Sequence, residues 1–154
     1  LLNLGWVENT KTIFKHYYDG ITPTIAGFLE RLDEERVAVS ENLGLKVEST
    51  KQWLKRTYKV EGDDLFQCIH NNEAYKTIDA PKTINHRYIF EDVPCGLVPL
   101  EAIGKKLGLK MKLTALVIDL ANELCGTDYR QSGRNLNNIL CNYSVDGFIS
   151  LMRG

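Results

Sequence analysis

A short stretch of the sequence, residues 86–99, holds the side chains whose types and spacing are best suited to chemistry. Arg87 carries a permanent positive charge on a planar guanidinium, which can hold a carboxylate or a phosphate through two parallel hydrogen bonds. Asp92 follows five residues later, and such a carboxylate could orient a histidine that acts as a general base. Five helical residues turn through about 500°, so the two side chains do not strictly share a helix face, but a turn or a frayed helix could bring both to one pocket wall. The alternative is a structural ion pair with a neighbour such as Glu91.

The residues around this pair predict how the backbone presents it. Val93-Pro94 should end any helix that contains Arg87, because proline lacks an amide hydrogen and restricts the residue before it. Upstream, residues 72–85 show only weak periodicity, and Pro81 excludes a long helix there. Loops of this length in compact domains are often binding elements, and this loop leads directly to Arg87.

Helical periodicity dominates the rest of the chain, whereas strand-like alternation is scarce. The longest predicted helix covers residues 23–43, with Thr22 as its cap, Pro23 at its first position and Gly44 at its end. Its expected apolar stripe comprises Ile25, Phe28, Leu29, Leu32, Val39 and Leu43. Its opposite face, interpreted as solvated, carries Glu30, Asp33, Glu34, Glu35 and Arg36.

Residues 112–125 are predicted to form the most buried helix and the axis of the core, with Gly126 closing it. The stripe behind this prediction comprises Leu113, Leu116, Val117, Leu120, Ala121 and Leu124. A shorter helix is predicted from the capping box that Ser49 forms with Gln52. We therefore expect an all-α fold, a compact bundle of about six to eight helices.

Composition and charge narrow the classes of partner. The whole chain, residues 1–154, is expected to be one globular domain, because 44% of its residues are apolar and it can bury roughly 70% of its unfolded surface. The net charge of −1, without a basic block or an acidic tail, argues against a nucleic acid partner. No apolar run approaches a membrane span and no signal peptide is recognised, so we expect no membrane partner.

The sequence has four cysteines: Cys68, Cys95, Cys125 and Cys141. Their spacing gives no CxxC pair, which argues against a metal site or a redox motif. We expect reduced thiols in a cytoplasmic protein with no metal.

The sequence contains neither a glycine-rich phosphate-binding loop nor a histidine that we assign as a catalytic base. Without a GxGxxG motif, this chain alone should not hold a dinucleotide pyrophosphate. His86 adjoins Arg87, but we interpret it as a surface or capping residue. His16 and His70 fall in helical patterns without a paired acid at a diagnostic spacing, so neither is assigned as a base.

Several blocks of the sequence, in their order and spacing, resemble the C-terminal domain of the opine dehydrogenases, the octopine and nopaline dehydrogenase family. The most specific block covers residues 87–99, RYIFEDVPCGLVP. The weaker blocks are Asn3-x-Gly5, residues 17–23, residues 33–36 and residues 133–136. Together they extend over nearly the whole chain, from residue 3 to residue 140. One departure falls at residues 110–112, Lys-Met-Lys, where relatives often have a Thr-Pro entry to the long helix.

The resemblance implies a two-domain enzyme. An N-terminal Rossmann domain would bind NAD or NADP, and this all-helical domain, like the C-terminal domain of 6-phosphogluconate dehydrogenase, would complete the active site. Family members condense an amino acid with a 2-oxo acid and reduce the resulting imine, so they act on CH–NH donors. By resemblance, Arg87 holds a substrate carboxylate and Asp92 pairs with a catalytic histidine. That histidine precedes the stretch that matches Leu1, so it is absent from this chain together with the Rossmann domain, and cofactor-binding residues stay unknown.

We therefore expect a catalytic substrate domain of an NAD(P)-dependent opine dehydrogenase-like oxidoreductase, whose isolated chain is inactive. Surface left open without the Rossmann domain would favour a homodimer. Two alternatives stay open. One is a helical dimerisation or interaction module without catalytic activity, and the other is the substrate domain of another two-domain NAD(P) dehydrogenase.

Overall fold

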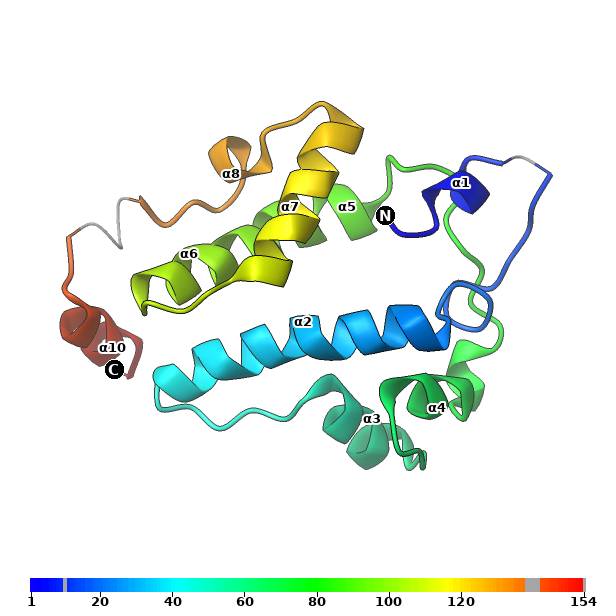
Figure 1. Ribbon diagram of the computed structural model, residues 1–154, viewed down its shortest axis with the longest axis horizontal. Helices are drawn as coiled ribbons and strands as arrows, with labels where there is room; N and C mark the ends of the chain where they lie inside the picture. Colours follow the sequence, from blue (N-terminus) through cyan, green and yellow to red (C-terminus); the bar gives the residue numbers. More distant parts are fainter. Residues whose placement is uncertain (10, 138–141, 154) are drawn as a thin grey trace. The chain divides into compact units, whose positions relative to one another are not determined.

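The structure is a computed structural model that describes residues 1–9, 11–137 and 142–153. Over these residues the chain is helical and forms no β-strand, and Lys15 and Asp79 share one isolated antiparallel bridge (Figure 1). This confirms the predicted all-α class. The chain divides into two compact units, one made of Leu1–Glu34 with Glu48–His86 and the other of Glu35–Val47 with Arg87–Gly154. A single domain over residues 1–154 stays a prediction.

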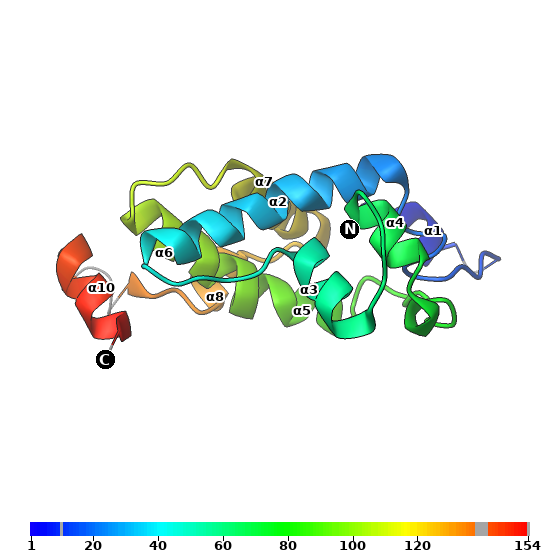
Figure 2. The same cartoon turned by 90° about the horizontal axis from the view of Figure 1, so that it is seen from below.

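Each unit has its own set of helices, which Figures 1 and 2 label in two views. The first unit contains α1 (Leu4–Val7), the start of α2 (Pro23–Asn42), α3 (Thr50–Tyr58), α4 (Leu65–His70) and a 3-10 turn, η1 (Glu73–Tyr75). The second contains the end of α2 together with α5 (Arg87–Phe90), the π-helical turn η2 (Val93–Leu97), α6 (Val98–Lys106), α7 (Lys112–Cys125), α8 (Tyr129–Ser132) and α10 (Val145–Arg153).

The local signals that predicted α2 are confirmed. The Thr22 hydroxyl accepts a hydrogen bond from the Ile25 amide at 3.3 Å, and Gly44 adopts a φ of 74° just after the helix. Members of the predicted apolar stripe do pack inward, but into two cores rather than one: Leu29 packs against the first core, and Val39 and Leu43 are buried in the second. Ala26 belongs to the core of the first unit, whereas Val39 belongs to the core of the second. The two halves of α2 therefore serve separate cores.

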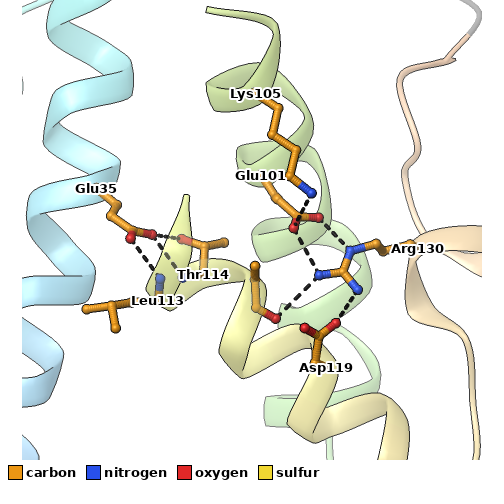
Figure 3. Close-up of polar contacts among 8 residues, drawn as sticks. Glu35, Glu101, Lys105, Leu113, Thr114, Asp119 and Arg130 are labelled. Atoms are coloured by element: carbon orange, nitrogen blue, oxygen red, sulfur yellow. Dashed lines mark hydrogen bonds and ion pairs between the residues drawn. The ribbon is translucent and has the colours of Figure 1, made fainter. Parts of the chain in front are cut away.

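Three carboxylates of α2 cap other helices, so the prediction of a solvated face is wrong for them. Glu30 accepts a hydrogen bond from the first amide of α4 at 3.1 Å, and Asp33 accepts one from the first amide of α3 at 2.6 Å. Glu35 accepts from the Leu113 and Thr114 amides at 2.8 and 2.9 Å and from the Thr114 hydroxyl at 2.7 Å (Figure 3). Helix N-termini leave amides unpaired, and a nearby carboxylate satisfies them and complements the helix dipole.

The Glu35 cap also explains how α7 begins without a Thr-Pro entry. Met111 precedes the helix, and its side chain provides no capping hydrogen bond. The carboxylate from α2 takes that role instead. Met111 itself is buried, and its sulfur would lie 2.3 Å from a Cβ on Gly104, so a larger residue at position 104 would require the Met111 side chain to shift.

The predicted core stripe of α7 is wrong. Its leucines Leu116, Leu120 and Leu124 are 53%, 37% and 43% exposed. Of the predicted stripe, Ala121 is buried, and the buried side of the helix is completed by Thr114 and Ile118. The helix is apolar around most of its circumference, so periodicity alone could not select the buried side. The hydrogen bond from the Thr114 hydroxyl to Glu35 lets a polar residue take a core position.

The loop that leads to Arg87 is confirmed as largely irregular, with η1 at its start. It is held by backbone hydrogen bonds to the segment before α2. The His16 amide donates to the Ile78 carbonyl at 2.8 Å, and the Ala80 amide donates to the Phe14 carbonyl at 3.0 Å. The capping box is confirmed at the start of α3, where the Ser49 hydroxyl accepts from the Gln52 amide at 3.2 Å.

Candidate active site

Arg87 and Asp92 lie on a helical stretch whose hydrogen-bond period changes between α5 and α6. The Glu91 amide donates to the Arg87 carbonyl at 3.0 Å, which is α-helical spacing. The Val98 amide donates to the Val93 carbonyl, five residues back, which is the spacing of a π-helix. The predicted helix end at Val93-Pro94 is therefore wrong, because Pro94 occupies the first turn of η2, where its missing amide is tolerated. Turns of this kind are frequent at functional sites.

The Arg87 guanidinium is exposed and weakly engaged. Its Nη2 lies 3.0 Å from Oε1 of Glu91, one turn further along, and the two side chains are 64% and 48% exposed. The sequence alternative of an ion pair with Glu91 is thus present in the structure. Exposed pairs at this spacing contribute only about 0.3–0.5 kcal/mol, so a substrate carboxylate could replace Glu91 at little cost.

Asp92 is exposed and immediately precedes η2. It provides no capping hydrogen bond, and over the described residues its carboxylate has neither a hydrogen bond nor an ion pair, including with Arg87. Five helical residues extend over about 7.5 Å, so the two side chains can act on different parts of one ligand. The exposed Asp92 carboxylate can therefore accept further hydrogen bonds.

An ion network centred on the buried Glu101 carboxylate joins α6, α7 and α8 in the same unit (Figure 3). Arg130 donates two hydrogen bonds to Glu101, from Nε at 2.6 Å and from Nη2 at 2.9 Å, and a third to Asp119. Lys105 donates to the same Glu101 carboxylate at 2.7 Å. Burial alone would raise the pKa of Glu101, but the hydrogen bonds from Arg130 and Lys105 outweigh it and lower the pKa below its ordinary value.

The turn after α8 contacts the candidate site directly. The Arg134 amide donates a hydrogen bond to the Pro94 carbonyl at 2.9 Å. This contact brings together residues 87–99 and 133–136, two blocks that carry the sequence resemblance. No role had been predicted from sequence for Gly133, Arg134 or the ion network. A signal was available, because the prolines at positions 94 and 99 remove two amide hydrogens five residues apart from one helical stretch.

The histidines that were not assigned as bases have other surroundings. Both ring nitrogens of His70 face backbone carbonyls, with Nδ1 3.0 Å from the Phe66 oxygen and Nε2 2.9 Å from the Tyr18 oxygen. Burial lowers the pKa of His16, and nearby positive charge, including that of His86, lowers it further.

Cysteines and acidic residues form no metal centre within the described ranges, where no group of three or more candidate ligands comes together. Cys68, Cys95 and Cys125 are free thiols, and Cys141 lies outside the described residues. No helix among the described residues is both long and apolar enough to span a membrane. A cytoplasmic location stays a prediction.

Known proteins resemble this chain both in sequence and in fold. An opine dehydrogenase of Arthrobacter sp. (strain 1C) is 37% identical over 139 residues, which cover 90% of this chain and 38% of that protein. The protein ocs of Agrobacterium vitis is 28% identical over 123 residues, or 80% of this chain and 34% of that protein. The chain thus spans well under half the length of these relatives.

Solved structures of octopine dehydrogenase share the fold. One, with NADH and L-arginine, has a TM-score of 0.69 and 21% identity over 97% of this chain and 45% of that protein. Another, with NADH and agmatine, has a TM-score of 0.68 and 20% identity over the same shares. The family described as NAD/NADP octopine/nopaline dehydrogenase, alpha-helical domain, matches residues 1–125, so this chain belongs to that family.

Proposed function

We propose that this chain is the substrate-binding and catalytic domain of an NAD- or NADP-dependent opine dehydrogenase. The reaction would join the amino group of an amino acid to the carbonyl carbon of a 2-oxo acid, with loss of water, and reduce the resulting imine. The observation that carries the proposal is a weakly paired, exposed Arg87 and an unengaged Asp92 on one helical stretch. Family membership supports it, as do related structures that contain NADH with L-arginine, agmatine or pyruvate.

Arg87 would anchor a substrate carboxylate. Both proposed substrates carry a carboxylate, and the planar guanidinium can hold one through two parallel hydrogen bonds. The ion pair with Glu91 keeps the side chain near its own helix until the substrate arrives. Because that pair is exposed and contributes little, exchanging it for a substrate carboxylate favours binding once water is excluded.

Asp92 would hold a catalytic histidine supplied from outside this chain. Condensation of an amine with a carbonyl requires proton transfers near neutral pH, which an imidazole can perform. A carboxylate fixes the tautomer of the ring and stabilises its protonated form. The free carboxylate of Asp92 leaves room for such a partner.

The cofactor would be held mainly by a Rossmann domain that this chain does not contain. The sequence has no glycine-rich loop to bind a pyrophosphate, so these residues do not suit that part of the cofactor. When bound, the reduced nicotinamide supplies the hydride. The role of this chain is to bind and orient the substrates next to it.

The test is an assay of the complete protein with a panel of amino acids, pyruvate and either NADH or NADPH. We expect oxidation of the reduced cofactor only when both an amino acid and the 2-oxo acid are present. Oxidation with pyruvate alone would indicate another two-domain dehydrogenase. No oxidation with any pair, in protein that binds cofactor, would support an interaction module without catalysis.

A further inference from the structure

We propose that the backbone of Gly133 and Arg134 acts as a clamp that positions Arg87 and Asp92. The clamp is the hydrogen bond from the Arg134 amide to the Pro94 carbonyl, at 2.9 Å. It makes Arg134 a positioning residue through its backbone rather than its side chain. The inference rests on the proposed function, because it concerns how that site is kept in shape.

The Pro94 carbonyl has no donor within its own helix. In an α-helix it would accept from the Val98 amide, but that amide donates to Val93 instead. In a π-helix it would accept from residue 99, which is a proline without an amide hydrogen. Pro94 is buried, and an unpaired buried carbonyl is costly. The Arg134 amide therefore supplies the partner that the helix cannot provide.

Gly133 lets the turn approach this closely. A Cβ at this position would lie 2.7 Å from the Pro94 oxygen, 2.9 Å from its Cα and 2.5 Å from the Tyr129 oxygen. All three atoms belong to the backbone, so no flexible side chain could move aside. Any larger residue would push the turn away from η2 and lengthen the hydrogen bond.

The turn that carries Gly133 and Arg134 is also held in place on the side of α8. Asp128 caps α8 by accepting from the amides of Arg130 and Gln131 at 3.0 and 3.1 Å. The Arg130 side chain is held by the buried Glu101 carboxylate of α6 (Figure 3). The Gly133 amide then donates to the Tyr129 carbonyl at 2.9 Å. These hydrogen bonds hold the turn that contacts Pro94 in place relative to α6 and α8.

Loss of the clamp would change the orientation of the site. A π-turn contains one more residue than an α-turn, and returning it to α-helical spacing rotates the upstream segment by about 100° and shifts it by about 1.5 Å. Asp92 and Arg87 both lie upstream of η2. A helix that alternated between α- and π-helical spacing would therefore hold Arg87 and Asp92 in two different orientations. Only one of these orientations could suit the substrate.

The experiment compares Arg134→Pro with Arg134→Ala in the complete protein. The proline removes the amide hydrogen, whereas the alanine keeps it and removes only the exposed side chain. Gly133 is extended, with φ −83° and ψ −169°, a conformation compatible with a following proline. We expect Arg134→Pro to lower kcat at least tenfold and to raise the KM of one substrate. Arg134→Ala should stay within about twofold of wild type in both constants.

Ile118→Val controls for general destabilisation, because it trims a fully buried core residue of the same unit. It should lower the melting temperature while leaving kcat near the wild-type value. If Arg134→Pro does not fold, Gly133→Ala replaces it, with the same expected loss of turnover. Wild-type kinetics in a folded Arg134→Pro or Gly133→Ala protein would overturn the proposal, as would a tenfold loss in Arg134→Ala.

Hydrogen exchange separates this inference from the proposed function. In the wild-type protein the Arg134 amide should exchange slowly, and Gly133→Ala should speed its exchange together with that of the Val98 amide. Fast exchange at Arg134 in the wild type would refute the clamp whatever the enzyme does. A protected Arg134 amide in a protein without amino-acid-dependent turnover would instead leave the clamp standing and remove the proposed function.

Discussion

Arg87→Lys in the complete protein should weaken substrate binding more than turnover. Lysine keeps the positive charge but loses the planar fork that grips a carboxylate at two points. We expect the KM of one substrate to rise at least tenfold, which corresponds to about 1.4 kcal/mol. Glu91→Gln is the matched variant, because it removes the competing carboxylate. Because an exposed ion pair contributes about 0.4 kcal/mol, its removal should lower the KM by about twofold.

Asp92→Asn should act on turnover instead. The amide preserves the shape of the side chain but removes the charge that stabilises a protonated histidine and fixes its tautomer. We expect kcat to fall on the order of a hundredfold, or about 2.7 kcal/mol in the activation free energy. The KM values should change far less than in Arg87→Lys.

Melting curves and steady-state kinetics on the same variants decide whether this reasoning holds. Both side chains are exposed, so each change should alter the free energy of unfolding by less than about 1 kcal/mol, or roughly 2–4 °C in Tm. If Arg87 and Asp92 served only to stabilise the fold, the reverse would be expected. Arg87→Lys and Asp92→Asn would then each lower the Tm by several degrees, with kinetics close to wild type. Normal turnover in Asp92→Asn would remove the aspartate from the mechanism.

Four further predictions concern the fold, cofactor binding and self-association. Glu35→Gln should destabilise the chain by about 1–3 kcal/mol in denaturant titrations, because an amide cannot replace all three hydrogen bonds of the cap. Glu34→Gln, at an exposed position of the same helix, should have almost no effect. The pKa of Glu101 is lowered in the folded protein, so its ionised carboxylate stabilises the fold fully at pH values above its ordinary pKa of 4.5. This stabilisation is lost as the pH falls through the lowered pKa of the folded state. Glu101→Gln should therefore flatten the dependence of Tm on pH below that value, and an unchanged slope would contradict this assignment. The isolated chain should bind neither NADH nor NADPH tightly, and micromolar affinity in calorimetry would disprove this. Sedimentation should show self-association of the isolated chain at high concentration, reduced by Leu116→Glu if the exposed leucines of α7 form the contact.

The parts of the fold that sequence predicted correctly are those decided by a few neighbouring residues. Thr22 caps α2, Ser49 forms a capping box with Gln52, and Gly44 and Gly126 take positive φ values of 74° and 60° where helices end. Each of these depends on one backbone conformation or one short hydrogen bond. No distant partner is needed to decide the outcome.

The predictions that were wrong depended on partners far along the chain. Glu35 contacts residues 78 and 79 positions away, and no periodicity within α2 can reveal that its carboxylate caps α7. The buried side of α7 was misassigned for the same reason, since apolar residues of several types, including Ala115, Val117 and Ile118 besides the leucines, cover most of its circumference. Sequence could identify Arg87 and Asp92 by residue type. The π-turn between them and α6 depends on a backbone contact from Arg134, which sequence reasoning had no means to place.

The second unit contains an ion pair that clearly serves the fold. The Glu101 side chain is 4% exposed, and Arg130 grips it through two hydrogen bonds of 2.6 and 2.9 Å. Arg87 differs in each respect, because it makes one contact of 3.0 Å to an exposed carboxylate. A guanidinium kept for stability would be expected to resemble Arg130, since exposed pairs contribute little to folding. The weak engagement of Arg87 therefore favours a role in which a ligand, rather than the fold, completes its hydrogen bonds.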